Sequence, residues 1–458
     1  MRLKQLILLF VITMPSLANA SYIGSQVNYN YSKTDNRIYL QVKYWRFCND
    51  SAENLIDSIE VEIPGCSSFK VNTTHTTIKD VSLHSGLYPN LTCKTPNSNN
   101  KVRGLEEFVG SASFSLDTAP FKTALTNGCC SVYFNVNVGI NRSKEITTGV
   151  GGLNRNYAFM NICNMKAANR DEIASPDFLL PMITDRFTCN NPAFIDFGAF
   201  SDGRDSVRYE LAAAIGKDRA DLQLPTSPLT LDFPMTPYCI GGGATCKNFP
   251  TYHPPTGFYF DPETSEIAFT PTDCNQTGVT VIQGNHWATD TNGVNLLVGR
   301  IRREITVFSS NIFLYVNQPP EMYRKYDLYT YIGDSILFLA RSIDIGIIPP
   351  PPIPTPKQDT TYILAKTNHP NVSMKIVDST QRERQIEVKF KPTTADLYQT
   401  IVCAMAVYDQ DSLPLRNMRS YRIQVRKKLD IAIAITTKPC GTVEFNLTMD
   451  SFDYSWVI

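Results

Sequence analysis

The sequence predicts an all-β protein made of several antiparallel β-sandwich domains in tandem. A chain of 458 residues has room for two to four domains of roughly 100 to 200 residues each. Its 24 Phe, 22 Tyr and 29 Pro favour strands joined by turns. The 43 basic residues balance the 43 acidic ones, so the chain has no net charge to attract nucleic acid.

Short segments that alternate apolar and polar residues support this fold class. The alternating segments are 37–44, 132–138, 386–390 and 421–425. A period of two residues is typical of strands with one buried face. Turn signals such as Asn127-Gly128 separate these segments. Helical periodicity is scarce, and we expect only a short helix near residues 210–215.

The start of the chain has the pattern of a secretory signal peptide. Arg2 and Lys4 precede an apolar run at 6–12, and a small-residue cleavage motif ends at Ala20. We therefore expect cleavage between Ala20 and Ser21. No later stretch has the roughly 20 apolar residues that a membrane-spanning helix needs. The sequence predicts an exported protein at the cell surface or outside the cell, with the periplasm as the alternative.

Twelve cysteines fit an exported chain. The number is even, no C-x-x-C motif occurs, and five histidines offer no paired zinc spacing, so disulfides are favoured over metal sites. The pairing cannot be read from the sequence, except that Cys239 and Cys246 bracket a short Gly-rich loop that one bridge would close. Neighbouring Cys129 and Cys130 are expected to reach different partners, because adjacent side chains in a strand point to opposite faces.

Two segments carry a resemblance to a known family. Residues 198–211 are similar to a "D-x-D-G-D-S-L-x-Y" strand, and residues 256–271 to "F-D-P-x-T-G-x-I-x-F-T-P-T". Both belong to the cadherin-like, immunoglobulin-like sandwiches of bacterial surface proteins. More particularly, the chain resembles secreted surface proteins of Bacteroidota of the gliding-motility-associated type. Residues 440–445 and 454–456 resemble the opening of a polycystic-kidney-disease-type (PKD) repeat.

The resemblance and the turn signals together divide the chain into five segments. These are a signal peptide (1–20), an N-terminal Cys-rich β domain (21–175), a cadherin-like β-sandwich (176–310), a second immunoglobulin-like β-sandwich (311–430) with a Pro-rich loop at 349–356, and the start of a PKD-type repeat (431–458). The chain stops inside the last segment, which we interpret as a truncated or vestigial repeat.

Calcium is the one cofactor for which the resemblance supplies candidate ligands, Asp202 and Asp205. Of the family's acidic residues in this loop, only Asp205 is kept, and Asp202 is displaced by one position. A calcium site needs six to eight oxygen ligands. We therefore favour a polar hairpin turn, in which Asp and Gly serve backbone geometry, and predict no cofactor.

Catalytic motifs are absent from the sequence. It contains no G-x-S-x-G, H-E-x-x-H or G-x-x-x-x-G-K-[ST] pattern. His286 beside Trp287 is the most tempting site, as a base or a sugar-stacking pair, but we favour a strand-end histidine because no carboxylate or nucleophile motif accompanies it. We expect no catalytic residues and no enzyme.

The function that the resemblance implies is that of a non-enzymatic, secreted cell-surface structural or adhesion protein, associated with gliding motility. Its expected partners are other surface proteins or extracellular glycans. One alternative is a secreted polysaccharide-binding or polysaccharide-active protein, and another is a calcium-dependent adhesin.

Overall fold

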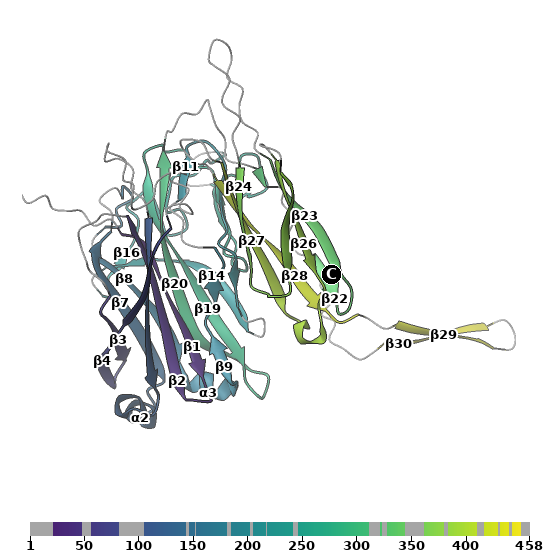
Figure 1. The fold of residues 1–458 in the computed structure, drawn as a ribbon, viewed down its shortest axis with the longest axis horizontal. Helices are drawn as coiled ribbons and strands as arrows, with labels where there is room; N and C mark the ends of the chain where they lie inside the picture. The colour runs from purple at the N-terminus through teal and green to yellow at the C-terminus, as the bar shows by residue number, and fades with distance from the viewer. Residues whose placement is uncertain are drawn as a thin grey trace, which may run out of the picture.

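The computed structural model describes the greater part of residues 22–449 (Figure 1). The described ranges are 22–47, 56–81, 105–142, 146–151, 153–180, 185–201, 205–216, 218–240, 246–310, 321–322, 328–343, 361–379, 383–409, 416–428, 431–438 and 442–449. The predicted signal peptide with its cleavage site at Ala20 and Ser21, and the Pro-rich loop 349–356, lie outside them.

A sheet of fifteen strands dominates residues 22–310, which we call the N-terminal unit. Its strands are β1 (Tyr22–Ser32), β2 (Arg37–Phe47), β3 (Ser58–Ile63), β4 (Ser67–Asn72), β5 (Thr74–Asp80), β6 (Leu105–Ser115), β7 (Ser131–Asn141), β8 (Leu153–Asn161), β9 (Glu172–Ala174), β11 (Asp185–Thr188), β14 (Ser206–Ala212), β15 (Ala214–Ile215), β16 (Leu222–Gln223), β19 (Thr277–Thr289) and β20 (Asn295–Ser310). The main path runs β4-β3-β7-β8-β20-β1-β2-β6-β5. The long strand β20 also pairs with β19 and β11, so it connects the early and late parts of the unit.

Two small sheets and two short helices complete the N-terminal unit. The sheets contain β10 (Asp177–Phe178) with β13 (Ala199–Phe200), and β12 (Ala193–Ile195) with β18 (Ile267–Phe269) and β17 (Phe258–Phe260). The helices are α2 (Ala119–Thr126) and α3 (Ile162–Ala168). Helix α3 begins where the Asn161 side chain accepts a hydrogen bond from the Asn164 backbone N–H, and it ends at Asn169 in the left-handed region.

Residues 321–426 form a two-sheet sandwich, which we call the C-terminal sandwich. Its elements are β21 (Glu321–Met322), β22 (Leu328–Tyr331), β23 (Ile336–Ile343), β24 (Thr361–Thr367), β25 (Ser373–Ser379), β26 (Glu383–Phe390), the 3-10 helix η3 (Thr394–Asp396), β27 (Thr400–Asp409) and β28 (Arg416–Arg426). The sheet orders are β21-β23-β26-β25 and β22-β28-β27-β24. Taken in chain order, these are the two strand sets of an immunoglobulin-like sandwich, with β22 running parallel to the last strand, β28.

A separate hairpin, β29 (Ile431–Lys438) with β30 (Thr442–Met449), follows the sandwich. Figure 1 shows it extending away from both units. It falls in the segment predicted to open a PKD-type repeat, and that assignment stays a prediction.

The all-β prediction is confirmed, and so is the alternation within the predicted strands. Ile38, Leu40 and Val42 on β2 are buried, and Tyr421 and Ile423 on β28 are buried as well. The helix predicted near residues 210–215 is wrong. Strand β14 covers residues 210–212 and β15 covers 214–215. The pairing of β14 with β19 over seven consecutive residues outweighs the helix preference of its Ala and Leu residues.

Strands from both sides of residue 175 hydrogen-bond in the large sheet, since β1 pairs with β2, β9 and β20. The predicted segments 21–175 and 176–310 therefore share one apolar core, which includes Val27, Phe134, Phe197 and Ile301. The domain boundaries themselves stay predictions.

Four disulfides join described cysteines, all within the N-terminal unit. They are Cys66–Cys129, Cys130–Cys163, Cys189–Cys274 and Cys239–Cys246. The expectation that Cys129 and Cys130 reach different partners is confirmed. The pair Cys239 and Cys246, named from the sequence, is bonded in the structure.

Cys403 on β27 is a free, buried thiol, and we expect it to resist alkylation in the native protein. Burial raises the pKa of its thiol to about 12, so the reactive thiolate is scarce at pH 8. Mass spectrometry after iodoacetamide treatment without a reductant tests this. The chain and its Cys403→Ser variant should carry equal numbers of labels when native and differ by one when unfolded. One extra label on the native parent chain would contradict the burial of Cys403.

Candidate functional site: the interface between the two units

The C-terminal sandwich packs one sheet against the N-terminal unit, and strand β27 is buried on both faces. Every residue from 401 to 407 is at most 1% exposed. Alternate residues, such as Cys403 and Met405, lie in the core of the sandwich. The intervening Ala404 and Ala406 belong to the apolar core of the N-terminal unit. A strand covered on both sides is expected to be a continuous apolar run, as Ile-Val-Cys-Ala-Met-Ala-Val is here.

The backbones of the two units approach each other closely at Gly198, which has a φ of +67°. A Cβ atom there would lie 2.3 Å from the Cβ of Ala404. Beside it, the Asp196 carboxylate accepts hydrogen bonds from the Gly198 N–H at 2.9 Å and from the Ser420 N–H at 2.8 Å. One buried carboxylate therefore holds the backbone of both units.

A buried ion pair also crosses the interface. The Arg419 guanidinium on β28 donates to the Glu266 carboxylate, next to β18, and its carbon lies 3.5 Å from the ring centre of Phe194. The two charged side chains are 7% and 2% exposed. Burial lowers the pKa of Arg419, although Glu266 and Asp196 oppose that effect. Because buried charges need partners, this pair is sensitive to the relative placement of the two units.

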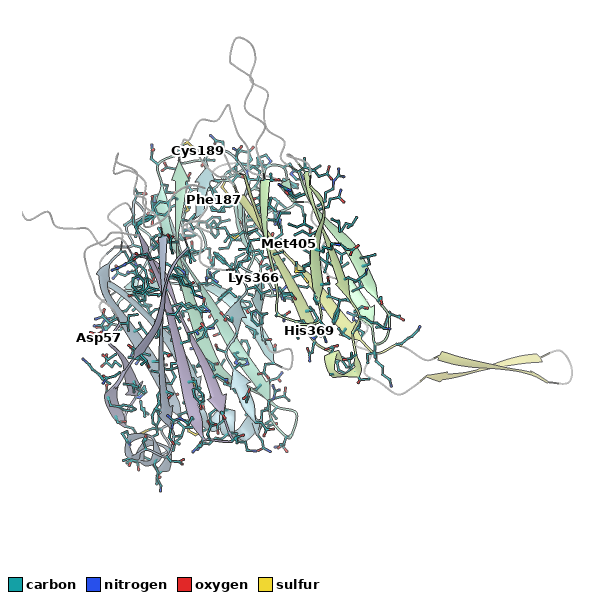
Figure 2. The ribbon with its side chains drawn as sticks, viewed as in Figure 1. Asp57, Phe187, Cys189, Lys366, His369 and Met405 are labelled. Atoms are coloured by element: carbon teal, nitrogen blue, oxygen red, sulfur yellow. A yellow bond between two sulfur atoms is a disulfide. The ribbon has the colours of Figure 1, made fainter. Side chains whose placement is uncertain are left out.

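A cavity of about 710 Å³ lies at the same interface. Strands β2, β5, β6 and β20 supply most of its wall, and Leu364 and Lys366 of β24 supply the sandwich side. Figure 2 shows Lys366 on the side of the sandwich that faces the N-terminal unit. Four cationic side chains (Lys43, Lys79, Arg303 and Lys366) face two acidic ones (Asp80 and Glu107) in the lining. The cavity therefore carries an excess of positive charge.

A second, smaller cavity of about 140 Å³ is lined by Asp205, which anchors a buried polar cluster. His286 on β19 places Nε2 2.7 Å from Asp205 and Nδ1 3.1 Å from the Tyr29 hydroxyl on β1. Arg170, two residues beyond α3, makes an ion pair with the same carboxylate. The side chains of His286 and Asp205 are fully buried.

The hydrogen-bond directions in this cluster follow from its chemistry. An ionised carboxylate only accepts, so His286 Nε2–H donates to Asp205, and in the neutral ring Nδ1 accepts from the Tyr29 hydroxyl. Burial and nearby Asp205 raise the pKa of Tyr29 above its ordinary value, which keeps the phenol protonated. A protonated, buried phenol is a poor nucleophile. The cluster ties β1, β19 and the start of β14 together.

The same cluster explains why residue 299 on β20 is a glycine. Gly299 lies opposite His286 in the pairing of β19 with β20. A Cβ at Gly299 would lie 1.9 Å from the Tyr29 hydroxyl oxygen and 2.8 Å from the Phe159 carbonyl oxygen.

We expect Gly299→Ala to destabilise the protein by roughly 1–3 kcal/mol, because Tyr29 is held by His286 and has no room to move. Urea unfolding measures this. Gly151→Ala is the matched control, since nothing lies within 4 Å of a Cβ at that position. Equal stability of the two variants would contradict the close packing around Tyr29.

The structure places the sequence-derived candidates as follows. Asp205 is engaged by Arg170 and His286, whereas Asp202 lies outside the described residues. Among the residues that are described, no group of three or more His, Cys, Asp and Glu side chains is placed to hold a metal ion. Calcium binding at this loop stays a prediction.

The interpretation of His286 as a strand-end histidine without a carboxylate is wrong. His286 lies within β19, and Asp205 joins it from 81 residues away. Tyr29 and Arg170 were also missed, because no local sequence signal links four residues that meet only through sheet pairing.

None of the described helices is long and apolar enough to span a membrane.

Comparisons with known proteins give no family assignment. No family model matches the chain, and no curated protein does. Among solved structures, titin domains Z1Z2 in complex with telethonin are 10% identical with a TM-score of 0.16, covering 55% of this chain and 97% of that one. Dpr2 Ig1-Ig2 in complex with DIP-Theta Ig1-Ig3 is 12% identical with a TM-score of 0.20, covering 55% and 99%. A three-immunoglobulin segment of titin is 8% identical with a TM-score of 0.15, covering 85% and 93%.

Each of these TM-scores is far below 0.5, so the likenesses carry no argument about function. The immunoglobulin-like description of residues 321–426 is based on their own strand order.

Proposed function

We propose that the chain is a non-enzymatic structural and adhesive protein of the cell surface, in which the N-terminal unit and the C-terminal sandwich act as one rigid spacer. The observation that carries this proposal is strand β27, whose two faces belong to two different cores. Domains joined by small polar interfaces move relative to each other, whereas a large apolar interface fixes them. A rigid body that presents loops at its ends is suited to holding contact surfaces at a set distance.

The buried polar groups of the N-terminal unit support a structural role as well. The buried Tyr29–His286–Asp205 cluster contains a histidine and a carboxylate, but its third member is a buried phenol where a catalytic triad has a reactive nucleophile. Four disulfides among the described residues are typical of proteins that work outside the reducing cytosol.

Deletion of the chain from the producing cells tests the proposal. We expect deleted cells to attach less to surfaces and to glide less, and we expect re-expression to restore both. Purified protein should release no reducing sugar from polysaccharides. Deleted cells that attach and glide like the parent, or a purified chain that cleaves polysaccharide, would contradict the proposal.

The calcium-dependent alternative has its own test, which is the melting temperature with and without millimolar calcium. Ligand binding to the folded state stabilises it, so a calcium-dependent adhesin would melt at a higher temperature with calcium. The rigid-spacer proposal expects no such rise, because Asp205 is already paired with Arg170 and His286.

A further inference from the structure

The cavity between the two units has the size and the charged groups of a ligand site. Its volume of about 710 Å³ lies within the 300–1,000 Å³ that is usual for pockets that bind small molecules. Arg303 at its wall is 1% exposed and is held by a hydrogen bond to the Leu180 carbonyl oxygen at 3.2 Å. The rings of Phe178 and Phe197 lie 4.7 and 4.0 Å from its guanidinium carbon. Arg303 is therefore a fixed positive charge.

Two lysines of the cavity, one from each unit, form no ion pair with an acidic side chain in the part of the chain that the structure describes. Lys79 lies on β5 of the N-terminal unit and Lys366 on β24 of the sandwich. No ion pair joins either lysine to an acidic side chain among the described residues, whereas Lys43 in the same cavity lies 3.5 Å from Asp177. A ligand with anionic groups at Lys79 and at Lys366 would contact both units at once.

The acidic groups of the cavity are acceptors, to which a ligand with hydrogen-bond donors can also bind. Asp80 and Glu107 are acceptors when ionised, and Glu107 already accepts from the Trp45 indole N–H at 2.9 Å. Gln41 offers both a donor and an acceptor. A saccharide with carboxylates supplies hydroxyl donors and anionic acceptors together. An acidic side chain of a peptide supplies only acceptors, so it cannot donate to Asp80 and Glu107.

We propose that this cavity binds an acidic saccharide, with carboxylates of the sugar at Lys79 and at Lys366 and its hydroxyl groups donating to Asp80 and Glu107. The inference deepens the proposed adhesive function, on which its biological meaning rests, by naming a ligand class. Because the lysines belong to different units, the bound sugar also bridges the interface.

Titration calorimetry of the full chain tests the inference with a uronic-acid trisaccharide as the probe, in 50 mM and 300 mM NaCl. We expect binding that weakens at the higher salt concentration, because the contacts are between opposite charges. Lys79→Gln and Lys366→Gln should each weaken binding about 5- to 10-fold, which is the loss of one charge-assisted hydrogen bond. Lys375→Gln is the matched control: this lysine lies on β25, in the other sheet of the sandwich, and its loss should leave affinity unchanged.

Two further probes identify the ligand class. A neutral trisaccharide of the same length and a triglutamate peptide should both bind at least 10-fold more weakly than the uronate. No binding of the uronate, equal weakening by Lys375→Gln, or triglutamate binding as tightly as the uronate would each overturn the inference. These outcomes leave the rigid-spacer function standing, because that function is tested separately by cell attachment and by unfolding.

Discussion

Replacing Arg419 with methionine is expected to destabilise the folded protein by about 3–5 kcal/mol, the usual cost of breaking a buried ion pair from one side. Glu266 would stay 1% exposed without its guanidinium partner. Methionine keeps most of the aliphatic length, and the lost cation–π contact of the guanidinium with Phe194 is part of this cost. Guanidinium chloride unfolding followed by fluorescence measures the change.

A double variant and an exposed pair serve as controls for this prediction. Adding Glu266→Gln to Arg419→Met removes the buried charge that has lost its guanidinium partner, so the double variant should recover more than half of the lost stability. The exposed pair of Arg341 and Glu383, with side chains 47% and 22% exposed, provides the matched comparison. Arg341→Met should cost less than about 1 kcal/mol. If Arg419→Met also cost less than that, the interface would not depend on this ion pair.

Replacing Asp205 with asparagine is expected to cost about 3 kcal/mol, because one carboxylate serves both Arg170 and His286. Asparagine has the same shape but no charge, and its amide group cannot accept from both partners through two equivalent oxygens. The loss of protection against hydrogen exchange should be largest for the backbone amides of β1, β14 and β19, since the cluster joins these strands. Hydrogen exchange measured strand by strand reports this distribution.

Asp334→Ala, in the exposed turn before β23, is the comparison for Asp205→Asn and should change stability by less than about 0.5 kcal/mol. Uniform loss of protection across the whole chain, or no loss at all in Asp205→Asn, would show that the cluster does not hold these strands together.

Local patterns identified the strands well. Alternate residues are buried from Ile38 to Tyr44 of β2 and from Tyr421 to Val425 of β28, because one face of each of these stretches lies in a core, and local sequence is then sufficient. The segment 210–215 shows the limit of local reasoning. Its Ala-rich sequence favours a helix, yet long-range pairing with β19 makes it a strand, and no local signal reports that pairing.

The interface could have been anticipated from one feature of the sequence. Residues 401–407 are seven apolar residues in a row. Such a run indicates burial on both faces and hence a second packed unit. The polar contacts across the interface could not be predicted, because Asp196 and Glu266 lie more than 150 residues from Ser420 and Arg419, their partners on β28. The cavity could not be predicted either, since Lys79 and Lys366 come from strands of different units.

Scanning calorimetry of the full chain tests the central claim, that the two units form one rigid body. Alternate residues of β27 lie in two different cores, so the two units should unfold together. We therefore predict a single thermal transition, with a ratio of calorimetric to van't Hoff enthalpy of about one. Two resolved transitions, or a calorimetric enthalpy about twice the van't Hoff value, would show that the units unfold independently and would contradict the rigid-spacer account.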